Sequence, residues 1–318
     1  MPLLQINASD DRLTSDGTML LDRHLRRQLS ALPKDAPIVV LVHGYSFSPF
    51  RRGRNPHTHI LSCFPPDRRG ILSWPRHLGF GRNSSDEGLC IAFGWHAWGH
   101  IWGAYRQARL AGHAFARLIE LFHDLGCDRP IHVMAHSLGA RVVLSGVAAA
   151  QYGKLGRVIL MAGAEFQAAA ALAATSTVGR RADIINIASR ENDLFDLLIE
   201  RLIHPFRRNR RTIGTGMAPG PANWLDIQID NPASLRTFAE MGFRIGAPTR
   251  RVCHWSPYLR PGMFAFYSAL IRQPDRLPLE TLQSVMPAAT DPRWSRLFPH
   301  LAYKHRLSLF SKMPRRSA

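Results

Sequence analysis

The sequence predicts an α/β protein in which a mostly parallel central sheet is covered by helices on both faces. Residues 37–43, "PIVVLVH", and residues 89–95, "LCIAFGW", are short apolar runs of the kind found in buried parallel strands. Segments with helical spacing of apolar residues follow such runs along the chain. With 318 residues and 46% hydrophobic content, the chain is long enough to bury a large core. Strands that alternate with helices favour a parallel sheet between two helical layers.

The remaining elements follow in the same alternation. Residues 102–125 place Tyr105, Leu110 and Phe115 near helical spacing, and Gly126 predicts the end of this helix. Further strands are predicted at residues 131–135, 157–162, 183–188 and 224–230, and further helices at about 138–150, 194–203 and 262–271. We expect one domain over residues 37–272, an N-terminal extension of residues 1–36, and a C-terminal extension of residues 273–318 with a basic, mobile end.

The chain is strongly basic, with a formal net charge of +18 and an isoelectric point near 11.1. Most of the positive charge is arginine, spread over every segment, with local clusters at residues 51–54, 207–211 and 304–316. Because no basic module with interleaved aromatic residues accompanies these clusters, nucleic acid is not an expected partner. A solvated surface is the simpler interpretation, and weak association of the basic end with an anionic membrane surface remains an alternative.

The cysteines indicate neither a zinc site nor a disulfide framework. Cys63, Cys90, Cys127 and Cys253 are scattered without any CxxC pair, so we expect buried thiols. No N-terminal segment has the pattern of a signal peptide, and no apolar run reaches the length that spans a bilayer. We therefore expect a cytoplasmic protein with no metal and no organic cofactor.

One serine lies between a predicted strand and a predicted helix. In "AHSLG", Ala135 and Gly139 flank Ser137 two residues before and two residues after. Small residues at these positions permit a tight strand-to-helix turn, which presents the serine hydroxyl together with the N–H groups of the helix start. This pattern predicts that Ser137 is a catalytic nucleophile.

The chain resembles an α/β-hydrolase over roughly residues 36–272. The runs "VLVHGYSFSP", "AHSLG" and "CHWSPY" are similar to those of a lipase-like bacterial branch whose substrates are mostly unassigned. Ala135 stands where the family usually has the first glycine of G-x-S-x-G, and this small residue preserves the turn. The resemblance implies the α/β-hydrolase fold and a Ser-His-acid triad.

The triad needs a base to accept the serine proton and an acid to orient that base. The resemblance places the base after the last strand, which favours His254. His204 precedes a proline at a helix end and is the weaker candidate. His136, the neighbour of the nucleophile, is expected to point away from the site and to serve as structural support.

In "INIASREND" the predicted strand ends and a helix begins, which is where the family carries its carboxylate. We therefore expect Asp193 to be the acid. Glu191 and Asp196 are its neighbours, either as alternatives or as charges at the helix start, and Asp226 is the main alternative elsewhere.

The remaining site residues would bind the substrate. The N–H of Leu138 supplies one oxyanion donor, and the resemblance assigns the other to Tyr45, whose side chain either adds a third donor or lines the pocket. Trp74, Trp95 and Trp98 are candidates for an apolar acyl or alkyl site, with packing as the alternative.

We expect a serine hydrolase that cleaves small-molecule carboxylic esters through an acyl-enzyme intermediate. The same residues would serve a thioesterase, an amidase or an acyltransferase. A non-catalytic binding protein on a hydrolase scaffold is the alternative from another class.

Overall fold

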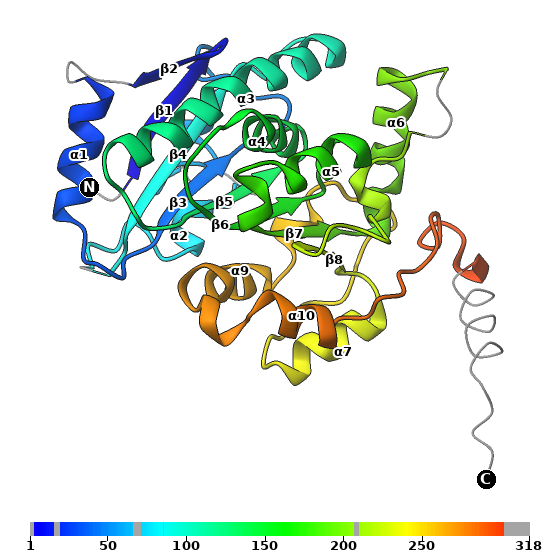
Figure 1. Ribbon diagram of the computed structural model, residues 1–318. Helices are drawn as coiled ribbons and strands as arrows, with labels where there is room; N and C mark the ends of the chain where they lie inside the picture. The colour runs from blue at the N-terminus through cyan, green and yellow to red at the C-terminus, as the bar shows by residue number, and fades with distance from the viewer. Residues whose placement is uncertain (1–2, 16–19, 66–70, 85, 207–209, 302–318) are drawn as a thin grey trace.

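The computed structural model describes residues 3–15, 20–65, 71–84, 86–206 and 210–301, and its centre is an eight-stranded sheet (Figure 1). The strands lie in the order β2-β1-β4-β3-β5-β6-β7-β8. They are β1 (Leu3–Ser9), β2 (Arg12–Ser15), β3 (Ile38–Val42), β4 (Leu89–Trp95), β5 (Ile131–His136), β6 (Leu155–Met161), β7 (Asp183–Ala188) and β8 (Trp224–Gln228). Only the pairing of β1 with β2 is antiparallel. The predicted mostly parallel sheet is confirmed.

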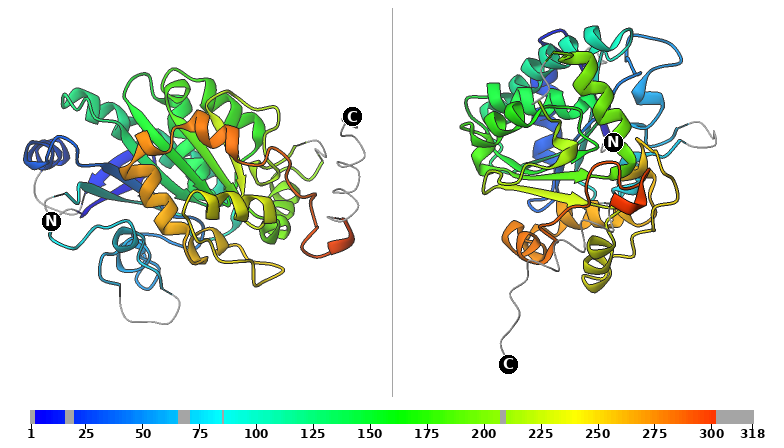
Figure 2. Two further views of the ribbon diagram at one scale, coloured as in Figure 1. Left: turned by 90° about the horizontal axis from the view of Figure 1, so that it is seen from below. Right: turned by 90° about the vertical axis from the view of Figure 1, so that its right-hand side faces the viewer.

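Helices cover both faces of the sheet, as the edge-on view in Figure 2 shows. On one face lie α3 (Ile101–Asp124), α4 (Leu138–Ala149) and α5 (Gln167–Thr175), and on the other lie α2 (Trp74–His77), α7 (Pro232–Glu240), α9 (Met263–Arg272) and α10 (Leu279–Val285). The remaining helices are α1 (Leu21–Ala31), α6 (Asp193–Ile203) and α8 (Ser256–Leu259).

The continuous apolar runs of the central strands follow from this double cover. In β3, Val40 and Val42 belong to the hydrophobic cluster that includes α3 and α4, whereas Val39 and Leu41 belong to the cluster that includes α9. Because successive side chains of a strand point to opposite faces, a strand buried on both sides needs apolar residues at every position.

The two extensions pack against the core. In the N-terminal extension, β1 pairs with β4 and buries Leu4, Ile6 and Ala8, so this part of the chain belongs to the sheet. Its polar alternation made it a weaker strand signal than the central runs. In the C-terminal extension, Leu282 and Met286 join the core beside α9. The basic end at residues 304–316 lies outside the described residues.

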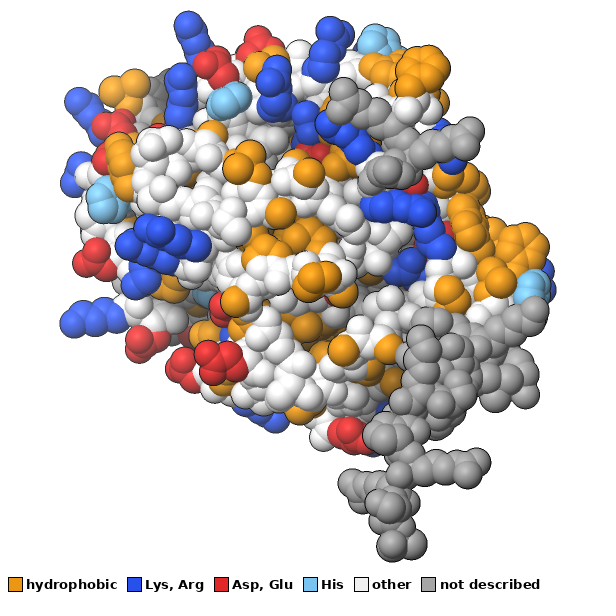
Figure 3. Space-filling model, turned by 45° about the vertical axis from the view of Figure 1, so that its right-hand side comes forward, with side chains coloured by type: hydrophobic (Ala, Val, Ile, Leu, Met, Phe, Trp, Pro, Cys, Tyr) orange, Lys and Arg blue, Asp and Glu red, His pale blue; other side chains and the backbone are white. Residues whose placement is uncertain are grey.

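Basic side chains are distributed over the surface. Lysine and arginine side chains are scattered across the face in Figure 3 and do not form one continuous patch there. No helix within the described ranges is both long enough and apolar enough to cross a membrane.

Candidate active site

The candidate site lies where the central parallel strands end. Ser137 follows β5, Tyr45 lies shortly after β3, and the 3-10 helix η3 (Arg190–Asn192) follows β7. Because the carboxyl ends of neighbouring parallel strands meet at one edge of a sheet, these segments converge. They enclose a cavity of about 550 Å³ that Ser137, Asn192 and His254 all line.

Ser137 lies in a strained turn between β5 and α4. Its backbone has φ 55° and ψ −126°, a conformation that L-residues rarely adopt. The turn is fixed because the N–H of Ser137 donates to the Met161 carbonyl at 3.0 Å and its carbonyl accepts from the Ala164 N–H at 2.9 Å. A Cβ on Gly139 would lie only 2.6 Å from the His43 carbonyl oxygen. This packing accounts for the glycine two residues after the serine.

Two backbone N–H groups border the serine. A Cβ on Gly44 would lie 2.8 Å from Ser137 Cβ, so glycine allows the loop after β3 to pack directly against the nucleophile. Neither the N–H of Tyr45 nor that of Leu138 donates to another group of the described chain. The Tyr45 hydroxyl donates to the Gly99 carbonyl, and Tyr45 lines the cavity.

His254 is hydrogen-bonded to Asn192. Its Nδ1 lies 2.6 Å from Asn192 Oδ1. The amide oxygen only accepts, so Nδ1 carries the proton and Nε2 is the acceptor. The structure therefore places Asn192, and not the predicted Asp193, against His254 Nδ1.

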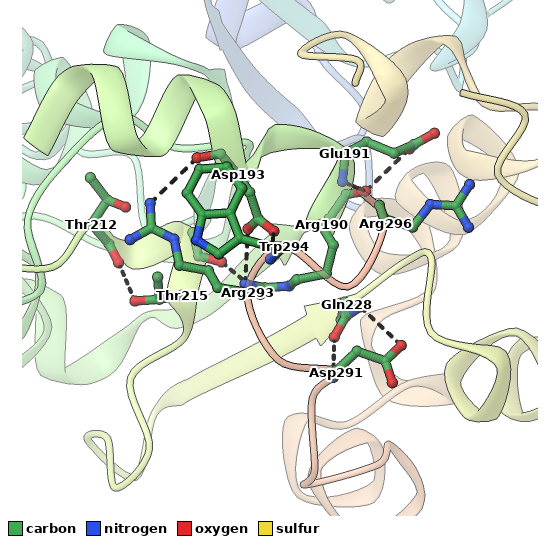
Figure 4. A network of polar contacts seen from close by, with 12 residues as sticks. Arg190, Glu191, Asp193, Thr212, Thr215, Gln228, Asp291, Arg293, Trp294 and Arg296 are labelled. Carbon is green, nitrogen blue, oxygen red and sulfur yellow. Dashed lines mark hydrogen bonds and ion pairs between the residues drawn. The ribbon is translucent and has the colours of Figure 1, made fainter. Parts of the chain in front are cut away.

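Asp193 has a different set of partners. Its carboxylate accepts from Arg190 at 3.2 Å and from the Trp294 N–H at 2.6 Å, as Figure 4 shows. As the first residue of α6, it also places negative charge at the positive end of the helix dipole. Burial raises the pKa of this carboxyl, although the neighbouring arginines oppose the shift.

Two aromatic rings pack against the imidazole of His254. The Phe195 ring stacks on it at 4.6 Å, and the His136 ring lies at 4.6 Å. Burial, together with the neighbouring His136, lowers the pKa of His254 well below its usual value. The imidazole is therefore neutral near pH 7, the state that a general base requires.

Neighbouring contacts hold the His254 loop against the Asn192 loop. His136 Nε2 lies 3.0 Å from the His254 carbonyl oxygen, to which it donates, and the Cys253 N–H donates to the Glu191 carbonyl at 2.9 Å. Burial lowers the pKa of His136 to about 4, so it is a neutral support. Unlike our expectation that it points away, His136 also lines the cavity.

The alternative candidates have structural partners. Glu191 is paired with Arg260 in the interior. Asp226 accepts from Asn186 Nδ2 at 2.7 Å and from the Met217 N–H at 2.6 Å, which is the local role its strand position suggested. Asp196 does line the cavity, where burial raises its pKa to about 7. His204 packs against Phe166.

The cavity walls differ from those predicted. The described residues that line the cavity include none of Trp74, Trp95 and Trp98. Trp74 is buried 5.3 Å from the Tyr258 ring, and Trp95 donates from Nε1 to the His43 carbonyl at 2.9 Å. The walls consist largely of apolar side chains that sequence reasoning did not select: Phe47, Ile60, Ile101, Phe195, Leu198, Ile199, Leu202, Trp255 and Tyr258.

The residues that the structure describes contain no group of three or more histidine, cysteine or acidic side chains placed to hold a metal ion.

The family model described as the alpha/beta hydrolase family matches residues 39–312. No curated protein matches the chain. Because the match covers most of the sequence and the sheet has the expected parallel order, the chain belongs to the alpha/beta hydrolase family.

Proposed function

We propose that the protein hydrolyses carboxylic esters with an apolar acyl or alkyl group, through an acyl-enzyme intermediate on Ser137. The observation that carries this proposal is the convergence of Ser137, His254 and two N–H groups without acceptors in the described chain on one largely apolar cavity. Such a cavity favours an apolar substrate group over a charged one.

In the proposed reaction, His254 Nε2 accepts the Ser137 proton while Oγ attacks the ester carbonyl. The Leu138 and Tyr45 N–H groups then donate to the oxyanion. His254 returns the proton to the leaving alcohol, and water repeats these steps to release the acid. No hydrogen bond joins Ser137 Oγ to His254 among the described residues, and catalytic contacts of this kind often shorten only when substrate is bound.

Asn192 gives this triad a neutral orienting group. Its amide oxygen fixes the tautomer of His254 but adds no negative charge beside the imidazolium that forms during the reaction. We therefore expect a slower proton transfer than a carboxylate in the same place would support.

The test is a series of 4-nitrophenyl esters from acetate to decanoate, assayed with wild type and Ser137→Ala. We expect kcat/KM to rise with chain length above acetate, because each buried methylene contributes about 0.8 kcal/mol until the cavity is filled. The Ser137→Ala variant is expected to be inactive. Equal rates for the two proteins would contradict the proposal, and a matched thioester and anilide would show whether the leaving group is restricted to alcohols.

A further inference from the structure

Arg54 adds a positive charge to a largely apolar cavity wall. It is the one arginine or lysine among the described residues that line the cavity. Its guanidinium carbon lies 4.5 Å from the centre of the Trp98 ring. Within the described ranges, Arg54 makes no ion pair with a carboxylate.

The loop that carries Arg54 is held by its own hydrogen bonds. The Ser48 N–H donates to the Arg54 carbonyl at 2.8 Å, and the Arg54 N–H donates to the Arg51 carbonyl at 3.1 Å. Ser48 Oγ lies 2.9 Å from His96 Nδ1. The Trp98 face positions the guanidinium plane, and the N–H groups at its edge remain suited to a bidentate anion. Trp98 thus supports a lining residue without lining the cavity itself.

None of the other ionisable groups among the described lining residues forms an ion pair with Arg54. His136 and His254 have pKa values lowered by burial, so both are neutral near pH 7. Asp196 is 2% exposed and belongs to α6, where burial raises its pKa to about 7. Among the described residues, the cavity therefore combines a largely apolar lining with one exposed arginine.

We propose that Arg54 binds an anionic group of the substrate, so that the natural substrates are esters with an apolar chain and a carboxylate or phosphate. This inference rests on the proposed function only in that the ligand is an ester that the protein hydrolyses. Binding of an anionic amphiphile to the cavity is a separate property that is measurable without turnover.

Calorimetry tests the binding with octanoate and octyl phosphate below their micelle concentrations and with octanol below its solubility limit. We expect wild type to bind at least one anion about fivefold more tightly than octanol, since an exposed charge pair contributes up to about 1 kcal/mol. Arg54→Gln should remove this preference. Arg52→Gln is the matched control, because Arg52 is an exposed arginine of the same loop that does not line the cavity.

Equal binding of the three ligands by wild type, or a preference that survives Arg54→Gln, would overturn the proposal. Thermal unfolding of both variants checks that they are folded. Comparison of octanoate with octyl phosphate shows whether a carboxylate or a phosphate is preferred. A preference for the anion that weakens in about 0.5 M salt would support a charge interaction.

Kinetics separate this inference from the proposed function. For 4-nitrophenyl hexanoate and mono-4-nitrophenyl adipate, we expect Arg54→Gln to raise KM for the adipate ester selectively and to leave its kcat similar to that of wild type. The adipate ester carries its carboxylate on the acyl side. An ester with the carboxylate on the phenol carries it on the alcohol side, so comparison of the two shows which side of the substrate Arg54 contacts. Ester turnover without anion preference would reject only the role of Arg54, whereas anion binding without turnover would reject only the hydrolase reaction.

Discussion

Two consecutive residues, Asn192 and Asp193, direct their side chains to different partners. Asn192 lies at the end of η3 and contacts His254, whereas Asp193 begins α6 and contacts Arg190 and Trp294. A turn of backbone between two helices directs neighbouring side chains to different sides. Asn192 and Asp193 therefore contact different partners although they are adjacent in the chain.

Replacement of each residue separates these roles. We expect Asn192→Ala to lower kcat by about a thousandfold, because the His254 tautomer is no longer fixed. Asp193→Asn should change kcat little but lower the free energy of unfolding by about 3 kcal/mol, because the buried Arg190 loses its counter-charge. Ester kinetics and urea unfolding of both variants provide the measurement, and the reverse pattern would restore Asp193 as the orienting acid.

A carboxylate at position 192 tests the neutral orienting group. In Asn192→Asp, the new negative charge should raise the pKa of His254, so the acid limb of the kcat profile should move to higher pH. Above that limb we expect kcat to increase by about tenfold, because the carboxylate stabilises the imidazolium. An unchanged pH profile would contradict the proposed role of His254 as a general base that position 192 orients.

Asp196 links stability to pH. Burial raises its pKa from 3.8 to about 7, so the unfolded state binds fewer protons than the folded state between these values. The free energy of unfolding should then fall as pH rises through this window. Asp196→Asn should be more stable than wild type at pH 8, by on the order of 1–4 kcal/mol, and nearly equal to it at pH 4. Urea unfolding at both pH values, with exposed Asp35→Asn as control, checks this expectation.

At the scale of elements, the turn between β5 and α4 depends on close backbone contact. Gly139 packs against the Val42 and His43 carbonyls, and Gly44 packs against Ser137. Ser137 and the N–H groups of Tyr45 and Leu138 are therefore positioned by contact between two neighbouring strand ends.

Gly139→Ala should be destabilising because its Cβ would approach the His43 carbonyl to 2.6 Å. We expect a loss of about 1–3 kcal/mol in the free energy of unfolding, together with lower ester turnover. Gly126→Ala is the control, because nothing lies within 4 Å of a Cβ there and only its backbone conformation is unfavourable. Unchanged stability and unchanged ester turnover in Gly139→Ala would contradict the role of this contact.

The segment after α10 also contributes to the site from a distance. Arg293 pairs with Glu200 of α6 at 2.8 Å, and the Trp294 N–H holds Asp193. Gln228 of β8 accepts from the Asp291 N–H at 2.7 Å, so the same segment is also tied to the sheet. The C-terminal extension thereby fixes the loop that presents Asn192.

At the scale of the whole molecule, the sequence predicted the features that have strong local signals. The apolar runs of β3 and β4 identify buried strands, and the small residues around Ser137 identify the tight turn. Both signals depend on the few residues of the segment itself, which explains why the structure confirms them.

Features that depend on side-chain direction or on distant contacts were less predictable. A carboxylate is the usual orienting group and favours Asp193, although the position of Asp193 at the start of α6 indicates another partner. Residue type makes the tryptophans candidates for the cavity wall, yet Trp74 and Trp95 pack in the core. Residues of α6 form much of the cavity wall instead. No pattern in the sequence specifies which face of α6 meets the site.

The mass of the protein after reaction with a fluorophosphonate tests directly whether Ser137 is the nucleophile. We predict one adduct per wild-type chain, located on Ser137 by peptide mapping, and no adduct on the Ser137→Ala variant, because only an activated serine attacks the probe. The His254→Ala variant should react far more slowly. Absence of labelling in folded wild type, or labelling that persists in Ser137→Ala, would contradict the assignment of Ser137 as the nucleophile.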